Sequence, residues 1–245
     1  MITAIVAYGS QIHGISYVSG PFLPAKPRLE ATAPMHFDTH KIYTFEDLEP
    51  NFIDTHQEIF TYKRGGGYWI WKHHIVLKHL HLINEDDTLV YFDGGCKLYN
   101  TSTARAHFAE YVDIVQKDPK GILAFELDGL PEHHWTKQSM VTYLEARYTT
   151  NLSQHMLSNQ RVGGIFFVRK TPFSVNFFTE YAEIIADDDT VLLDSKEHES
   201  PSFKEHRHDQ SLFSLLTKIY NVTTLPDMTW THTDQYPIYA ARSRH

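Results

Sequence analysis

Hydrophobic and polar residues follow one another along the chain in short blocks, and each block predicts one helix or strand. Uninterrupted apolar runs that end in glycine or polar residues predict buried strands. Apolar residues three or four positions apart predict helices with one buried face. The predicted strands cover residues 2–8, 41–45, 89–92, 122–126 and 163–168. The predicted helices cover residues 68–83, 104–115, 136–146, a segment that begins at Thr171-Pro172, and 212–219 after Asp209.

Strands that alternate with helices predict an α/β fold with a mixed, mostly parallel sheet flanked by helices. The stretch 20–34 carries four prolines and has no period, so it is predicted to be irregular. The sequence has no long linker, internal repeat or low-complexity tract. We therefore expect residues 1–245 to form a single domain.

The composition limits the kinds of binding partner and the cellular compartment that we expect for this protein. A chain of 245 residues buries enough surface to fold without disulfides or a structural metal, and the single cysteine, Cys96, can form no internal disulfide. The net charge of -8 argues against a nucleic-acid partner. The sequence begins without a basic-apolar leader and contains no apolar run long enough to cross a bilayer. We therefore expect a cytoplasmic protein with no membrane span.

Asp93 is the first candidate functional residue. It follows the buried run 89–92, and two glycines follow it. A carboxylate at the carboxyl end of a central strand points into the crevice where α/β sheets bind ligands, and neighbouring glycines let a ligand approach the backbone. The alternative interpretation is a turn, because Asp-Gly is a common hairpin signal.

A second candidate cluster surrounds a predicted helix start. Trp69 and Trp71 are roughly 200° apart on a helix, so one can pack in the core while the other faces a cleft. Lys72 at the helix start is placed to meet a phosphate, and Arg64 precedes the glycine run 65–67. The alternative is a pair of core tryptophans beside a solvated lysine.

Two further pairs each have a structural alternative. Asp209-Gln210 precedes an amphipathic helix, where Asp is also a good N-cap. Gly163-Gly164 precedes an apolar strand, where glycine also marks a β-bulge. The 17 histidines do not show a zinc spacing, and His206-Arg207-His208-Asp209 is only a fragment of a metallohydrolase signature.

The order of these motifs resembles a known family. Residues 64–72, Arg-Gly-Gly-Gly-Tyr-Trp-Ile-Trp-Lys, and residues 87–96, Asp-Thr-Leu-Val-Tyr-Phe-Asp-Gly-Gly-Cys, are separated by an apolar helix. This arrangement is similar to small bacterial and viral glycosyltransferases of the GT-A fold. The later pieces that fit the same order are Trp135-Thr136-Lys137, Gln160 with Gly163-Gly164, Asp209-Gln210-Ser211, and Tyr236-Pro237-Ile238 near Arg242 and Arg244.

The resemblance implies a GT-A-like fold and a reaction. A sugar would pass from a nucleotide-sugar donor, most simply a UDP- or GDP-sugar, to a hydroxyl of a glycan or glycoprotein acceptor. Asp209 and Gln210 would lie near the reacting carbon as catalytic residues, and the Asp-Gln pair implies retention of configuration. The implied donor-binding residues are Arg64, Trp69, Trp71, Lys72, Asp93, Gly95, Gly163, Gly164 and Arg242.

One departure affects the implied cofactor. Asp93 matches the first Asp of the family's Asp-x-Asp motif, but Gly95 stands where the metal-binding third residue is expected. Either Asp93 holds Mn²⁺ or Mg²⁺ with other ligands, such as His232, or basic side chains replace the cation. The departure also motivates an alternative function, a non-catalytic carbohydrate-binding protein of the same fold. A metallohydrolase that uses the histidines is a third class.

Overall fold

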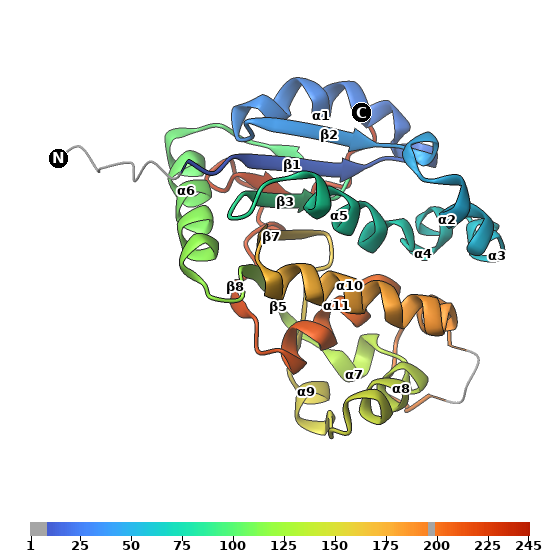
Figure 1. The fold of residues 1–245 in the computed structure, drawn as a ribbon. Coiled ribbons are helices and arrows are strands. Elements are labelled where there is room, and N and C mark those ends of the chain that lie inside the picture. Colours follow the sequence, from blue (N-terminus) through green and yellow to red (C-terminus); the bar gives the residue numbers. More distant parts are fainter. Residues whose placement is uncertain (1–8, 196–198) are drawn as a thin grey trace.

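The computed structural model describes residues 9–195 and 199–245, and seven of the strands in these residues form one sheet (Figure 1). The sheet has the order β2-β1-β3-β7-β5-β6, and β8 also pairs with β5. The strands are β1 (Ile12–Tyr17), β2 (Thr39–Tyr43), β3 (Thr88–Phe92), β5 (Ile122–Pro131), β6 (Asn159–Arg161), β7 (Ile165–Arg169) and β8 (Thr223–Pro226). The pairings make β1, β2, β3, β5 and β8 point one way and β6 and β7 the other. The predicted α/β fold with a mixed, mostly parallel sheet is confirmed.

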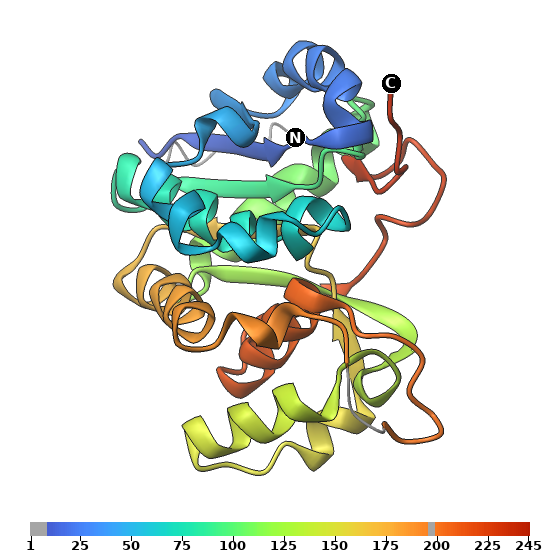
Figure 2. The same ribbon diagram turned by 90° about the vertical axis from the view of Figure 1, so that its right-hand side faces the viewer.

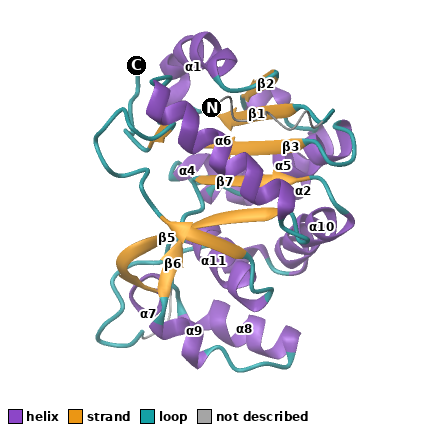
Figure 3. Ribbon diagram, turned by 90° about the vertical axis from the view of Figure 1, so that its left-hand side faces the viewer, coloured by secondary structure: helices purple, strands orange, loops and turns teal. Residues whose placement is uncertain are grey.

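Helices cover both faces of this sheet, which explains the continuous apolar runs of its central strands. Leu89 and Tyr91 of β3 pack into one hydrophobic cluster, whereas Val90 and Phe92 pack into another. The first cluster takes in α5 (Trp71–Leu82), α10 (Pro172–Asp187) and α11 (His208–Ile219). The second takes in α1 (Lys26–Thr32) and α6 (Ser102–Lys117), which crosses the strands in Figure 3. Two cores of this kind hold the strand ends in fixed positions.

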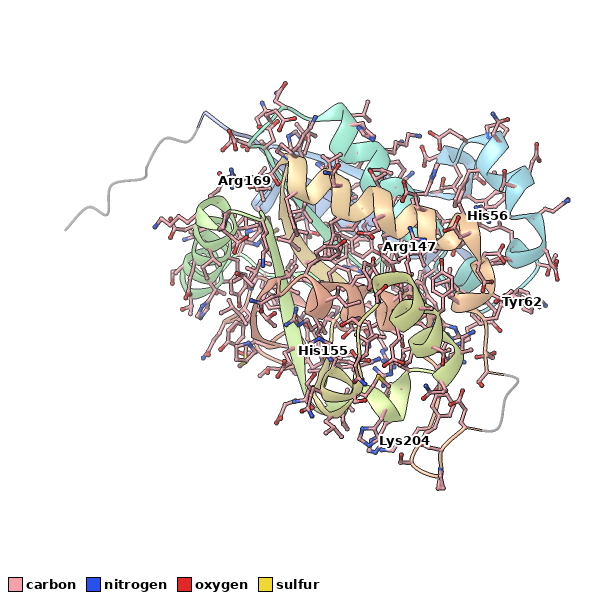
Figure 4. All side chains as sticks on the ribbon, turned by 60° about the horizontal axis from the view of Figure 1, so that its bottom comes forward. His56, Tyr62, Arg147, His155, Arg169 and Lys204 are labelled. Atoms are coloured by element: carbon pink, nitrogen blue, oxygen red, sulfur yellow. The ribbon has the colours of Figure 1, made fainter. Side chains whose placement is uncertain are left out.

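The remaining helices extend this framework at its ends. Helices α7 (Glu132–Trp135), α8 (Gln138–Tyr148) and α9 (Ser153–Leu157) lie in the lower part of Figure 1. Arg147 of α8 pairs with Asp187 of α10 at 2.7 Å and points toward that helix in Figure 4. Helices α2 (Pro50–Thr55), α3 (Gln57–Phe60) and α4 (Gly65–Tyr68) precede α5. None of the helices in the described ranges is both long and apolar enough to cross a membrane.

The C-terminal segment returns across the molecule to the carboxyl end of β3 (Figure 2). Strand β9 (Ile238–Tyr239) pairs with β4 (Lys97–Leu98) in a small second sheet. Arg28 of α1 fixes the final residue, because its Nε donates to the His245 carbonyl at 2.7 Å. This return places Arg242 beside Gly95.

One sequence prediction about the N-terminal third is wrong, and one is not tested. The stretch 20–34 is not irregular: it forms a 3-10 segment (Gly20–Ala25), helix α1 and a 3-10 turn (Ala33–Met35). The prolines do not prevent this, because Pro21 and Pro27 stand at helix starts, where proline is favoured. The strand predicted at residues 2–8 lies outside the described residues.

Strand β1 was missed because His13 and Gly14 interrupt its apolar pattern. In the structure, the His13 ring has hydrogen-bond contacts with Thr39 and Asp87. Glycine is needed at position 14, because a Cβ on Gly14 would lie 2.2 Å from the Phe37 ring. Both exceptions to the pattern therefore have a packing reason that only the fold reveals.

Candidate active site

The carboxyl ends of β1 and β3 open into a cavity of about 870 Å³. Its walls are the segments that follow these two strands, the glycine-rich turn before α5, the start of α11 and the C-terminal segment. The volume is that of a typical small-molecule site. Its position at the carboxyl ends of the strands is where α/β sheets bind ligands.

Asp93 provides a carboxylate that faces this cavity. Its Oδ1 accepts a hydrogen bond from the Tyr91 hydroxyl at 2.7 Å, and its side chain remains 43% exposed. The turn that Asp-Gly predicts is present, because the Cys96 N–H donates to the Asp93 carbonyl at 2.9 Å. It does not form a hairpin, since β3 pairs with β1 and β7 and not with β4, the next strand in the chain. Asp93 is therefore oriented by its neighbour and open to a ligand.

Lys72 and Asp209 form a buried ion pair at the base of the cavity. The Lys72 ammonium donates to Asp209 Oδ2 at 2.5 Å and to the Gly163 carbonyl at 2.9 Å. It also lies 3.7 Å from Asp93 Oδ1, so it stands between the two carboxylates. The solvated-lysine interpretation is wrong, since only 5% of the Lys72 side chain is exposed.

The N-cap interpretation of Asp209 is also wrong. Helix α11 begins at His208, its N-cap position is Arg207, and Asp209 lies inside the first turn with its carboxylate on Lys72. Burial would lower the pKa of Lys72, but the carboxylates of Asp209 and Asp93 outweigh burial and raise it. Burial raises the pKa of Asp209 to about 6 against the attraction of Lys72. Both groups are therefore charged at neutral pH.

Gln210 is held beside this pair by its amide. Its Oε1 accepts from the Gly163 backbone N–H at 3.3 Å, and its Nε2 donates to Gln160 Oε1 at 2.8 Å. Gln160 in turn donates to Glu132 at 2.9 Å. Gln210 lines the cavity, and these hydrogen bonds orient its amide.

The glycine-rich turn has an unusual backbone. Five consecutive residues, Gly65–Trp69, have positive φ angles, and the regular helix α5 begins only at Trp71. Glycine is the residue that adopts this conformation without strain, which explains the run of three. The turn curls the chain so that Arg64 reaches the cavity.

The two tryptophans of this segment differ in burial, but not for the predicted helical reason, because Trp69 has a φ of 61° and precedes the regular helix. Trp71 is buried, stacks on Tyr17 with ring centroids 3.8 Å apart, and donates from Nε1 to the Gly65 carbonyl at 2.9 Å. Trp69 is partly exposed and stacks on His208. Both line the cavity, but Trp71 mainly fixes the turn.

Glycines allow several chain segments to meet at the site. A Cβ on Gly164 would lie 2.5 Å from Asp93 Oδ2, and a Cβ on Gly163 would lie 2.9 Å from the Gln210 Cα. A Cβ on Gly95 would lie 2.9 Å from the Arg242 Cα. The C-terminal segment therefore occupies the space that a carboxylate at Gly95 would need. The β-bulge interpretation of Gly163-Gly164 does not hold, since both glycines lie in the connection between β6 and β7.

Three arginines line the cavity, and sequence analysis found two of them. Arg64 forms ion pairs with Glu205 and Asp194. Arg242 lies over the Trp230 ring at 4.7 Å. Arg207, which was missed, lies over the Trp135 ring at 4.1 Å. Its position two residues before Asp209 was the available signal, but the flanking histidines suggested a metallohydrolase fragment instead.

The predicted metal ligands do not converge. His232 does not line the cavity, and its ring packs edge-on against Tyr239. In residues 9–195 and 199–245, no three His, Cys, Asp or Glu side chains are grouped so that they could hold a metal ion. Asp209 and Glu205 are already paired with Lys72 and Arg64. The donor set around Asp93 therefore does not fit a resident Mn²⁺ or Mg²⁺ ion held by protein ligands.

Comparisons with known proteins leave the family open. No family model matches the chain, and no curated protein sequence matches it. Among solved structures, mouse xyloside xylosyltransferase 1 in its apo form is similar at 10% identity and a TM-score of 0.45, covering 94% of this chain and 97% of that one. Mannose-6-phosphate isomerase from Helicobacter pylori is similar at 10% identity and a TM-score of 0.38, covering 80% and 85%. These similarities are too weak to assign an activity.

Proposed function

We propose that the chain is a glycosyltransferase that uses a nucleotide-sugar donor. The observation that carries the proposal is the exposed Asp93 carboxylate at the end of β3, which faces a basic wall across a cavity of ligand size. A donor of this class combines a ribose hydroxyl pair, a charged diphosphate and a sugar. Asp93 can accept from hydroxyls, and the arginines can hold the diphosphate.

The proposed reaction follows from the position of the buried pair. The bond from the anomeric carbon to the diphosphate oxygen breaks, and its electron pair leaves with the diphosphate. The acceptor hydroxyl forms the new bond on the same face, and its proton passes to the leaving oxygen. Positive charge that develops on the sugar ring is stabilised by the Asp209 carboxylate, and the leaving group by the arginines. This arrangement gives retention of configuration.

The acceptor is proposed to bind at Trp230, which lines the cavity and is 47% exposed. A flat indole face offers a stacking surface for a sugar ring. Replacing Trp230 by Ala is expected to raise the KM for the acceptor about tenfold, as for an aromatic contact worth about 1.4 kcal/mol. Trp230→Phe keeps a ring and should stay near wild type in steady-state kinetics. Equal acceptor KM values for Trp230→Ala and wild type would show that the acceptor does not bind at Trp230.

Donor binding tests the proposal at Asp93. A panel of UDP-, GDP-, dTDP- and CMP-sugars should contain at least one donor that raises the melting temperature, because ligands that bind only the native state stabilise it. Asp93→Ala should weaken that donor about 10-fold or more, as for the loss of a charged hydrogen bond.

Two controls accompany this experiment. Asp93→Asn preserves shape and removes charge, and exposed Asp38 replaced by Ala measures the effect of removing a carboxylate outside the cavity. Unchanged donor binding by Asp93→Ala would reduce Asp93 to a structural role. Tight donor binding by wild type without any product in a turnover assay would instead favour the non-catalytic binding protein.

A further inference from the structure

The charged side chains that line the cavity contrast with the rest of the chain. Five lining residues are cationic and three are carboxylates, a formal excess of two positive charges. They are Lys63, Arg64, Lys72, Arg207 and Arg242, against Asp93, Glu205 and Asp209. His208 adds no charge at neutral pH, because burial lowers its pKa to about 4. The chain as a whole has a net charge of -8, so positive charge is concentrated at this site.

Most of these charges are already paired. Lys72 is neutralised by Asp209, and Arg64 by Glu205. No carboxylate in residues 9–195 and 199–245 forms an ion pair with Arg207 or Arg242. The cavity therefore presents two guanidinium groups that are available to an anionic ligand.

Arg207 is held in place by its ring contact and backbone. Its guanidinium lies 4.1 Å from the Trp135 ring centroid, and its N–H donates to the Trp135 carbonyl at 2.9 Å. Burial lowers the pKa of Arg207, and the charges of Arg242 and Arg64 lower it further, since the three groups share one wall. A planar guanidinium that is already desolvated and oriented is suited to bind phosphate oxygens.

Two contacts disfavour a metal ion beside Asp93. Lys72 stands 3.7 Å from Asp93 Oδ1, and the backbone of Arg242 fills the space beside Gly95. A divalent cation at Asp93 would therefore lie next to an ammonium group. It would also add positive charge to a cavity whose lining already has a formal excess of two positive charges. Like charges at such distances repel one another strongly in a partly dry site.

We infer that Arg207 and Arg242 bind the donor's diphosphate directly and make a divalent cation unnecessary. The inference rests on the proposed function and names the donor class as nucleoside diphosphate sugars, because a bridging diphosphate carries the two negative charges that balance the cavity. The arginines then stabilise the leaving group, as a metal ion would in other enzymes.

Binding of UDP, UMP and inorganic pyrophosphate by titration calorimetry tests the inference in the full chain. UDP and pyrophosphate should bind in excess EDTA with a Kd within about threefold of that in saturating Mg²⁺, because no metal contact is lost. UMP should bind about tenfold more weakly than UDP or worse, since it lacks one charged group. These titrations use only the wild-type protein, so a variant that fails to fold cannot affect their outcome.

Arg207→Gln should weaken UDP and pyrophosphate about 10- to 100-fold. Arg207→Lys, which keeps the charge and loses the planar fork, should fall between this variant and wild type. Arg242→Gln provides a second test on the C-terminal segment, and Arg105→Gln, an exposed arginine on α6 outside the cavity, is the matched control. Melting curves report whether each variant is folded.

The outcomes separate the inference from the proposed function. Diphosphate binding that appears only with Mg²⁺, or that both Arg207→Gln and Arg242→Gln leave unchanged, overturns the inference and leaves the glycosyltransferase proposal standing. UMP binding as tight as UDP binding also overturns it. A chain that binds none of the nucleotides, pyrophosphate or nucleotide sugars in either condition contradicts both.

Discussion

Replacing Lys72 by Met is expected to lower the free energy of unfolding by about 3–5 kcal/mol, measured by urea denaturation. The variant leaves the Asp209 carboxylate buried without its partner, since Lys72 is the cation within hydrogen-bond distance of that group. An uncompensated buried charge costs far more than the loss of methylene packing, which Met largely preserves.

Two further variants isolate the cause. Lys72→Met combined with Asp209→Asn removes both charges and should recover most of the lost stability without restoring turnover. Lys78→Met changes a lysine on the same helix whose pair with Glu49 is partly exposed, and should cost about 1 kcal/mol or less. A Lys72→Met protein as stable as Lys78→Met would show that the buried pair does not hold the site together.

Asp209→Asn is expected to reduce turnover at saturating donor and acceptor about a hundredfold or more, a barrier increase of about 2.7 kcal/mol. Asn can still accept the Lys72 hydrogen bond through its carbonyl oxygen, and Asp93 Oδ1 at 3.7 Å remains as a carboxylate beside the ammonium. The variant should therefore lose less stability than Lys72→Met, and it should still fold and bind the donor. What it lacks is the negative charge that, in the proposed reaction, stabilises the sugar ring as the diphosphate leaves. Near-normal turnover in a folded Asp209→Asn protein would leave Asp209 only as the partner of Lys72.

The pH profile of kcat/KM gives an independent check on the same residue. Burial raises the pKa of Asp209 to about 6, so the reactive carboxylate form is present above that pH and is lost as pH falls through it. Wild-type kcat/KM should therefore decline below pH 6, and Asp209→Asn should show no decline there. An identical acidic limb in both proteins would assign the titration to another group.

Some parts of the site follow from local sequence pattern. Asp93 was predictable because a buried apolar run ends in Asp-Gly-Gly, and that order places a carboxylate at a strand end whatever the rest of the fold does. The run Gly65–Gly67 likewise indicates a turn, and the structure shows that its backbone has positive φ angles. The α/β class followed from helix faces such as Ala104, Phe108 and Tyr111, which the structure buries.

Other parts depend on contacts between distant segments. Lys72 and Asp209 are 137 positions apart, so neither residue's neighbours show that they form a pair. The sequence shows that Gly95 departs from the Asp-x-Asp motif, but it does not show why a side chain is excluded there. The structure shows it, because a Cβ on Gly95 would lie 2.9 Å from the Arg242 Cα. Arg207 gains its role from Trp135, which no spacing in the chain predicts.

Product analysis tests the central claim most directly. Wild-type protein incubated with the nucleotide sugar that binds best, and with a panel of glycan acceptors, should release the nucleoside diphosphate and transfer the sugar. Asp209→Asn should bind the same donor and release at most about a hundredth as much nucleotide in the same time. Release of nucleotide at equal rates by the two proteins would contradict the assignment of this cavity as the active site, and no release by wild type from any donor that binds would contradict the proposed activity.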